Sequence, residues 1–506
     1  MIGYPFQTMI GRLLRALLPL SAFLVAVHGA WPQNAPAPSV AGIWLGALNA
    51  GGVSLRIQVQ IQGAEPSRTT CSLDSIDQGA FGIPCSNVKV EGSAVSFDVP
   101  AVAGKWSGHI STDGKTLSGT WTQGQPMPLV MQRQATALSG PKAPSPDAAM
   151  SPVALADLKG VLDRDLAAQL STGQLAPGTH IGLTIGVLQH GERRILTYGV
   201  AKEDSVFEIG SITKTFTATI LAQMVEQGMV RLDEPVRELL PPGTVAKPAG
   251  PEITLLDLSD QHSGLPRMPD NFHPAHPENP YADYDAKLLY QFIAKIGVAV
   301  PPNASFLYSN LGVGLLGQAL SNRAKMPYPE LLRQQVTGPL GMNDTAVALT
   351  PSTQSRFLPG YDGEGHSAHA WDLDALAGAG AIRSTAADML IYLEAQLHPD
   401  KLPPAVLAQP KGKTLPAAIA QTHVIHGEAG PGMHIALNWL RFDATGSYWH
   451  NGGTGGYSSY ALFNQDKDFA LVVLCNCSPG PRSLTDKLGM HISQRLRGEP
   501  AVSLAP

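Results

Sequence analysis

The chain has 506 residues, of which 44% are hydrophobic, and a formal net charge of −5 at pH 7. A chain of this length and apolar content can form two globular domains with real hydrophobic cores. The slightly acidic balance excludes a strongly basic surface of the kind that binds nucleic acid. We therefore expect a large folded protein without a nucleic-acid partner.

The first 30 residues have the pattern of an export signal. Arg12 and Arg15 precede a short apolar run at residues 17–27, and small residues follow it. This order is typical of a cleavable signal peptide, and the run is shorter than a usual membrane span. We expect residues 1–30 to be removed and the mature protein to be periplasmic or secreted, with a retained N-terminal anchor as the alternative.

Residues 40–134 have the pattern of a small all-β module. Apolar side chains alternate strictly in the segment 53–61, and Asp113-Gly114 is typical of a hairpin turn. The pattern predicts a small antiparallel barrel or sandwich, followed by a Pro/Ala/Ser-rich linker at residues 135–151. A stabilising domain and a module that binds cell-wall or carbohydrate material both fit this segment.

The chain contains four cysteines in two pairs. Cys71 and Cys85 are close enough in sequence to bridge the ends of a loop, and export permits disulfides, so we expect a bond between them. Cys475 and Cys477 lie two apart on a strand-like run and would face the same side of it. For these two we expect an ordinary pair of buried thiols.

Residues 152–498 predict a domain of class α+β, with an antiparallel sheet flanked by helices and an all-helical lobe. The elements expected in chain order are a helix at 154–171, a hairpin at 181–200, helices and loops in the middle, strands at 436–440 and 457–474, and a final helix at 482–497. The first and last strands would pair in one sheet, with a cleft between the sheet and the helical lobe.

The most informative pattern is Ser211 with Lys214, three residues apart at the start of a segment with helical apolar spacing. On a helix this spacing places an amine beside a hydroxyl, and a serine hydroxyl becomes a nucleophile only when a base takes its proton. The tetrapeptides at 86–89 and 139–142 match the same spacing, but the first is strand-like and the second contains a proline. A helix N-cap followed by a solvated lysine is the structural alternative for the pair.

Two later motifs add polar groups in a fixed order. Tyr308 and Asn310 form the chain's Tyr-x-Asn, in a polar turn before the helix-like run 311–320. His450 begins His-Asn-Gly-Gly, with Gly452 and Gly453, immediately before a strand-like segment. Tyr308 could share a proton with Lys214, and the glycines would let a substrate approach backbone donors closely.

These motifs resemble those of the penicillin-recognising serine hydrolases, which include class C β-lactamases, D-alanyl-D-alanine carboxypeptidases and related esterases. That family has Ser-x-x-Lys, Tyr-x-Asn and a Lys/His-x-Gly triplet in this order. Supporting similarity extends over about residues 155 to 495, through the segments Leu232-Asp-Glu-Pro-Val, His262-Ser-Gly-Leu-Pro266, Gly338-Pro-Leu-Gly-Met342 and Gly380-Ala-Ile-Arg-Ser-Thr385. Arg383 in the last segment is either structural or borders the cleft.

The resemblance implies a mechanism through an acyl-enzyme. Ser211 would attack a carbonyl, Lys214 and Tyr308 would move protons, and water would release the acyl group. Asn310 would hold the substrate amide. The backbone N–H groups of Ser211 and Gly453 would form the oxyanion hole.

The third motif departs from the β-lactamase pattern, because no Lys-Thr-Gly occurs in the chain. A histidine has an ordinary pKa of ~6.5, so His450 would supply a weaker positive field than lysine for the carboxylate that penicillins and D-alanyl peptides carry. We expect a β-lactamase or D-alanyl-D-alanine carboxypeptidase type of hydrolase. A carboxylesterase of the same family and a penicillin-binding sensor that is acylated without turnover are the alternatives.

No cofactor or metal is expected. The segment 312–317 fits Gly-x-Gly-x-x-Gly, but it reads as the interior of an apolar helix whose glycines permit close packing. The two His-x-x-His pairs, at 273–276 and 366–369, are better interpreted as loop histidines than as metal ligands.

Overall fold

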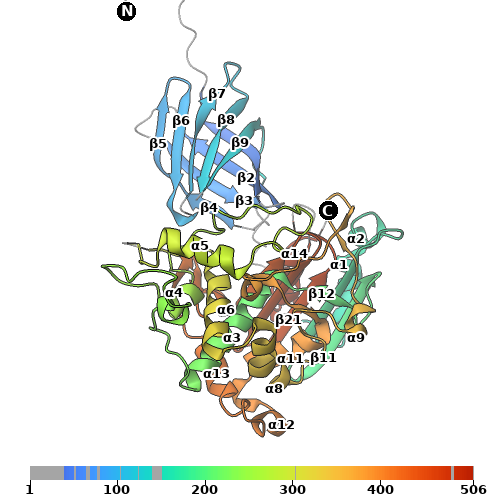
Figure 1. Ribbon diagram of the computed structural model, residues 1–506. Helices are drawn as coiled ribbons and strands as arrows, with labels where there is room; N and C mark the ends of the chain where they lie inside the picture. Colours follow the sequence, from blue (N-terminus) through green and yellow to red (C-terminus); the bar gives the residue numbers. More distant parts are fainter. Residues whose placement is uncertain are drawn as a thin grey trace, which may run out of the picture. The chain divides into compact units, whose positions relative to one another are not determined.

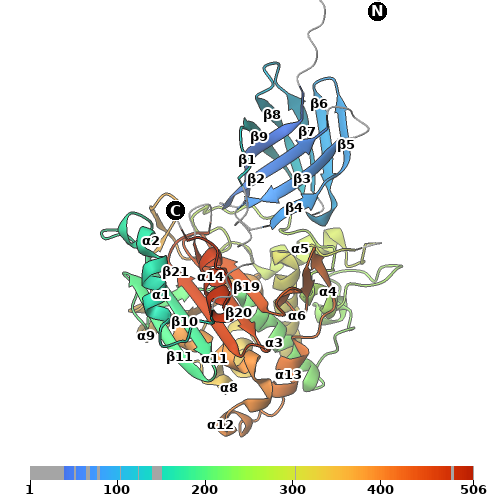
Figure 2. The ribbon, with the colours of Figure 1, turned by 180° about the vertical axis from the view of Figure 1, so that it is seen from behind.

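The computed structural model describes residues 39–50, 53–63, 69–76, 80–102, 104–123, 125–138, 151–301, 304–479 and 484–504. The predicted signal peptide at residues 1–30 and most of the predicted linker lie outside these residues. The described chain combines antiparallel sheets with helices, which confirms the α+β prediction (Figures 1 and 2). None of its described helices is long and apolar enough to cross a membrane.

The first part of the described chain is a nine-stranded antiparallel sheet with the order β4-β3-β2-β1-β9-β8-β7-β6-β5. Its strands are β1 (Gly42–Ala50), β2 (Val53–Gln62), β3 (Thr70–Ser75), β4 (Ala80–Pro84), β5 (Ser86–Glu91), β6 (Ala94–Val99), β7 (Gly104–Ile110), β8 (Thr116–Gln123) and β9 (Gln125–Gln134). Strands that are neighbours in sequence pair with each other except β4 and β5, which form the two edges, and β1 also pairs with β9. These edge strands follow each other in the chain. Their ends must therefore come close together, and the sheet is nearly closed.

Large aromatic side chains fill the inside of this sheet. Trp44, Phe97, Trp106 and Trp121 are all buried. The indole N–H of Trp106 donates to the Leu129 carbonyl at 3.2 Å. Such interiors satisfy the polar atom of each large aromatic residue while burying its apolar body. The side chains on the inside of the sheet therefore form a hydrophobic core.

The second sheet has eight antiparallel strands in the order β11-β10-β21-β20-β19-β18-β17-β16. Its strands are β10 (Gly182–Gln189), β11 (Glu192–Gly199), β16 (Gly427–Gly430), β17 (Met433–Ile435), β18 (Leu440–Phe442), β19 (Tyr448–Gly453), β20 (Ser458–Asn464) and β21 (Phe469–Cys475). Early strand β10 pairs with late strand β21, Gln189 opposite Phe469. The predicted pairing of first and last strands is confirmed.

Helices cover both faces of this sheet. Helices α1 (Leu158–Asp165) and α14 (Thr485–Arg497) share one apolar cluster with the sheet, and Figure 2 shows them on that face. Helix α11 (Ala386–Leu397) contacts β10, β20 and β21 from the other side. Every residue of β20 and β21 is buried, as expected for strands that are covered on both faces.

The helical lobe is built around α3 (Thr213–Glu226) and α6 (Asn310–Ala324). Residues 213–224 of α3 are all buried, and a helix that is buried all round belongs in the middle of a core. The remaining helices are α2 (Ala167–Ser171), α4 (Leu255–Ser259), α5 (Ala286–Ile296), α7 (Tyr328–Leu332), α8 (Gly338–Leu340), α9 (Pro351–Gln354), α10 (Ala377–Gly380), α12 (Pro404–Leu407) and α13 (Leu415–Gln421). Two short pairs of strands, β12 (Val206–Glu208) with β15 (Arg383–Thr385) and β13 (Gly360–Tyr361) with β14 (Ser367–Ala368), complete the fold.

The predicted glycine packing on α6 is confirmed. A Cβ atom on Gly314 would lie 2.4 Å from Leu376 Cδ2, and one on Gly317 would lie 3.1 Å from Gly378 Cα. The glycines therefore let α6 pack against α10 almost backbone to backbone. The Gly-x-Gly-x-x-Gly pattern here serves helix packing.

Two sequence predictions were wrong in detail. The strand expected at 436–440 is a tight connection between β17 and β18, in which the Ala436 N–H donates to the Trp439 carbonyl at 2.8 Å. Asn438 has φ +57°, a left-handed conformation that interrupts a strand. Cys475 and Cys477, expected as thiols, form a disulfide with Cα atoms 5.2 Å apart.

Cys71 and Cys85 are also joined by a disulfide, with Cα atoms 5.1 Å apart and a sequence separation of 14. We predict that the double variant Cys71→Ser, Cys85→Ser lowers the free energy of unfolding of the nine-stranded sheet by about 3 kcal/mol, because the open loop gains entropy when the sheet unfolds. Calorimetry of the full chain measures this change. A transition at the wild-type temperature would contradict the prediction.

Candidate active site

Ser211 lies in a short 3-10 turn, Gly210–Ile212, between β12 and α3. The turn continues directly into α3, so Ser211 precedes the helix by two residues and Lys214 is the second residue inside it. Lys214 Nζ lies 2.9 Å from Ser211 Oγ. The spacing of three residues does bring the amine to the hydroxyl, as the sequence predicts.

Lys214 is completely buried, and its Nζ also donates a hydrogen bond to the Ala379 carbonyl of α10 at 2.7 Å. Burial lowers the pKa of Lys214 well below its ordinary value, and the positive charge of Arg267 lowers it further. The Lys214 Nζ thus donates to two oxygens, the Ala379 carbonyl and the Ser211 hydroxyl. The amine is therefore held directly against the Ser211 hydroxyl in a buried site.

Tyr308 stands on the extended segment before α6, in a turn that Gln261 holds in place. The Leu307 N–H donates to the Gln261 carbonyl at 2.8 Å, and the Ser309 N–H donates to the Gln261 side chain at 2.8 Å. Burial raises the pKa of Tyr308 to about 12, although Arg267 and a hydrogen bond with Ser211 oppose the shift. The Tyr308 phenol is thus protonated at neutral pH and adjoins the Ser211 hydroxyl.

His450 closes the same cluster from strand β19. Its ring centroid lies 6.2 Å from that of Tyr308, and its Nδ1 donates to the Asn451 carbonyl at 2.6 Å. Burial lowers the pKa of His450 to about 3; any positive charge on Lys214 acts in the same direction, and the hydrogen bond to Asn451 opposes the shift. His450 is therefore a neutral imidazole under ordinary conditions.

The end of β19 and the turn before Ser211 touch backbone to backbone. A Cβ atom on Gly452 would lie 2.0 Å from the Ile209 carbonyl, and one on Gly210 would lie 2.6 Å from the Gly453 nitrogen. Gly210 also has φ +50°, which favours glycine. The glycines at 452 and 453 thus permit contact with the nucleophile turn.

Asn310, the first residue of α6, points its amide toward a small group of side chains. Its Nδ2 lies 3.8 Å from Met268 Sδ, and a hydrogen bond from Asn310 lowers the pKa of Tyr281 against the raising effect of burial. Its buried Oδ1 accepts no hydrogen bond from any described residue. An unpaired buried carbonyl oxygen is suited to accept an N–H from a bound molecule.

Sequence reasoning missed two side chains of this cluster, Arg267 and Tyr281. Arg267 Cζ lies 5.2 Å from the Tyr308 ring centroid, and Tyr281 packs on Trp371 with centroids 5.0 Å apart. Arg267 directly follows the His262-Ser-Gly-Leu-Pro266 segment, which was the one available signal. No spacing rule connects Tyr281 with the three motifs, since it reaches the site through a long loop.

Arg383, which the sequence left undecided, is structural. Its Nη2 lies 3.2 Å from Glu208 Oε1 and 3.1 Å from Asp372 Oδ1, and the side chain is buried. Because β12 and β15 carry Glu208 and Arg383 on paired positions, this ion pair fixes the strand that leads into the Ser211 turn.

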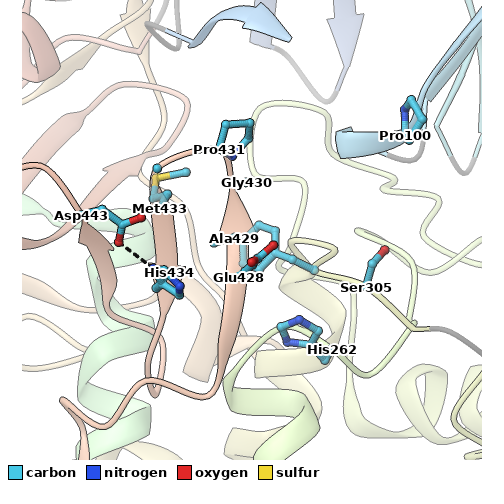
Figure 3. A pocket seen from close by; sticks show the side chains of 12 residues that line it. Pro100, His262, Ser305, Glu428, Ala429, Gly430, Pro431, Met433, His434 and Asp443 are labelled. Carbon is cyan, nitrogen blue, oxygen red and sulfur yellow. Dashed lines mark hydrogen bonds and ion pairs between the residues drawn. The ribbon is translucent and has the colours of Figure 1, made fainter. Parts of the chain in front are cut away.

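A separate group of polar side chains surrounds β16 and β17 (Figure 3). His434 Nδ1 lies 2.6 Å from Asp443 Oδ1, and His262 and Glu428 stand nearby in the view. None of the residues drawn there belongs to the three motifs. Among the described residues, no group of three or more metal-binding side chains is close enough to hold an ion.

A protein-family model described as Beta-lactamase matches residues 167–491. The match includes all three motifs and leaves out the nine-stranded sheet. Three curated relatives align over a similar region. They are a D-alanyl-D-alanine-carboxypeptidase/endopeptidase, AmpH, of Escherichia coli (28% identical, covering 63% of this chain and 86% of the relative), a Beta-lactamase of Pseudomonas fluorescens (27%, covering 63% and 94%) and a Beta-lactamase of Escherichia coli (24%, covering 58% and 84%).

The backbone contact between Gly210 and Gly453 gives a direct test. We predict that Gly210→Ala abolishes reaction of Ser211 with a serine-directed fluorophosphonate, because the new methyl group would displace the Gly453 nitrogen. Gly228→Ala is the matched control: Gly228 also has positive φ, +67°, but a Cβ there meets nothing within 4 Å. It should cost about 1 kcal/mol of stability and keep the reaction. Equal labelling of the two variants would contradict the prediction.

The environment of His450 gives a second test. Because its pKa is lowered to about 3, we predict that its imidazole signals in an NMR titration stay constant between about pH 5 and 8. An unfolded histidine binds a proton near pH ~6.5, so the unfolded state binds more protons below that pH and His450 makes the fold less stable as the pH falls. A midpoint near neutral pH for His450 would contradict its burial as a neutral ring.

Proposed function

The chain belongs to the β-lactamase family, and from this membership and the site geometry we propose that residues 152–498 form a serine hydrolase that works through an acyl-enzyme. The relatives with the highest identities above are a hydrolase of D-alanyl peptides and a β-lactamase. The proposed substrates are accordingly β-lactams or D-alanyl peptides. The proposal rests on one observation above all: a buried amine, Lys214, lies 2.9 Å from the Ser211 hydroxyl.

In the proposed reaction Lys214 Nζ takes the proton from Ser211 Oγ as the oxygen attacks the substrate carbonyl carbon. A neutral amine is needed for this step, and the lowered pKa of Lys214 provides it. The protonated phenol of Tyr308 then gives its proton to the leaving nitrogen. The raised pKa of Tyr308 keeps the phenol protonated until this step, and the ammonium of Lys214 then returns a proton to the phenolate; the hydrogen bond of Tyr308 with Ser211 supports this role.

The negative charge on the carbonyl oxygen would be held by the backbone N–H groups of Ser211 and Gly453. The close contact of the Gly210 and Gly453 backbones supports this assignment. Removing one such donor typically reduces the rate by ~10²–10³. Asn310 would accept the N–H of the substrate amide at its unpaired oxygen, and water would then release the acyl group.

One observation favours a second candidate, a carboxylesterase of the same family. His450 occupies the position of the third-motif lysine and is a neutral ring, so it contributes no charge to a substrate carboxylate. An ester substrate needs no such charge. A penicillin-binding sensor is the third candidate, and the protonated Tyr308 beside Ser211, a proton donor for turnover, argues for hydrolysis instead.

We further propose that the enzyme acts in the periplasm or outside the cell, because residues 1–30 have the signal-peptide pattern and Cys71–Cys85 is a disulfide. The nine-stranded sheet would act as a stabilising domain or as a binding module for cell-wall material.

We predict that a short exposure to benzylpenicillin produces a covalent adduct on the wild-type protein and none on Ser211→Ala, as intact-mass spectrometry over time will detect. Thr213→Ser, a conservative change two residues away, is the control and should keep the adduct. Rapid loss of the adduct identifies a β-lactamase, and persistence identifies a peptidase or sensor. Absence of any adduct and of drug consumption would reject the amide-directed function and leave the esterase.

A further inference from the structure

The backbone of Arg267 is hydrogen-bonded to the start of α6, next to the Tyr308-x-Asn310 motif. Its backbone carbonyl accepts the N–H groups of Asn310 at 3.0 Å and of Leu311 at 3.2 Å. These are the first two residues of α6, whose early N–H groups have no partner within the helix. The position of Arg267 is therefore fixed relative to Tyr308 and Asn310, although it lies on a loop.

The guanidinium of Arg267 faces the catalytic cluster without a partner of its own. Its Cζ lies 5.2 Å from the Tyr308 ring centroid, while Lys214 Nζ lies 4.9 Å from the same centroid. Arg267 is exposed to solvent. No described residue forms a hydrogen bond or an ion pair with its guanidinium.

Arg267 carries a permanent charge, in contrast to the two other described side chains with contacts to the Tyr308 ring, Lys214 and His450. Lys214 has a pKa well below its ordinary value, and His450 is neutral because its pKa is near 3. The third motif, in which β-lactamases usually have lysine, thus offers no cation here. An arginine keeps its charge at every relevant pH.

We propose that Arg267 is the specificity-determining residue that binds the free carboxylate of the substrate, from the loop after Pro266 instead of from β19. Its planar guanidinium can donate two parallel hydrogen bonds to a carboxylate. This inference rests on the proposed acyl-enzyme function and names its substrate class: acyl donors with a carboxylate on the leaving-group side of the scissile bond. Penicillins and peptides that end in D-alanine both have this chemistry.

The nearby Arg383 cannot take this role. Its guanidinium is buried and shared between Glu208 and Asp372, so its charge is already neutralised. A second role for Arg267, lowering the pKa of Lys214 through space, would affect every substrate equally. A pair of substrates that differ only in the carboxylate separates the two roles.

The experiment compares two acyl donors, the benzoylglycyl ester of glycolic acid, which has a free carboxylate, and the methyl ester of that compound, which has none. We expect the wild-type enzyme to prefer the carboxylate form. In Arg267→Gln, kcat/KM for that form should fall about 10- to 100-fold, mainly through KM, because a charge-assisted pair is lost. The rate with the methyl ester should change less than about twofold.

Arg267→Lys should recover part of the loss, since lysine restores the charge without the planar fork. Arg231→Gln, at an exposed arginine paired with Asp233, is the matched control and should leave both rates unchanged. Because both probes are esters, the comparison can be made whether or not penicillin is a substrate. The amide-directed function is tested separately, by the penicillin adduct.

Two results would overturn the inference. One is a wild-type enzyme that shows no preference for the free carboxylate. The other is an equal loss on both esters in Arg267→Gln together with a shift of the acidic limb of the kcat/KM profile to higher pH. The second result would mean that Arg267 acts only by lowering the pKa of Lys214.

Discussion

The catalytic domain depends on keeping an amine in a place where water cannot reach it. Lys214 belongs to α3, which is buried from Thr213 to Met224, and its Nζ has two oxygen neighbours, Ser211 Oγ at 2.9 Å and the Ala379 carbonyl at 2.7 Å. A charged ammonium in such a position carries a large desolvation cost, and this burial lowers the pKa of Lys214 well below its ordinary value. The fold thereby favours the neutral amine beside the Ser211 hydroxyl.

This arrangement requires that α10 approach α3 closely enough to supply the Ala379 carbonyl. The glycines of α6 make that approach possible, because α10 rests directly on their backbone. Thr217 of α3 adds a hydrogen bond to the Gly378 carbonyl at 2.7 Å. The burial of Lys214 therefore depends on how α3, α6 and α10 pack together. Residues of α6 and α10, which are distant from Lys214 in sequence, contribute to its environment.

The three motifs and the α+β class could be predicted because each has a local signature, a fixed spacing or a hydrophobic period. Arg267 and Tyr281 could not, since their place beside Tyr308 depends on loop paths that have no periodicity. The same limit explains the two errors: a left-handed Asn438 interrupts the strand expected at residues 436–440, and no local pattern signals the disulfide between Cys475 and Cys477. Motifs with a fixed local spacing could be predicted from the sequence. Tertiary contacts made by irregular segments could not.

The pairing of β10 with β21 has a consequence for the order of events during synthesis. Ser211, Lys214 and Tyr308 leave the ribosome long before the strands that complete the sheet, and Gln189 must wait for Phe469 to arrive. Contacts between such distant segments form late and slowly. The Gly453 backbone cannot reach the nucleophile turn until that happens. The contact between the Gly453 backbone and the turn that carries Ser211 can therefore form only when almost the whole polypeptide exists.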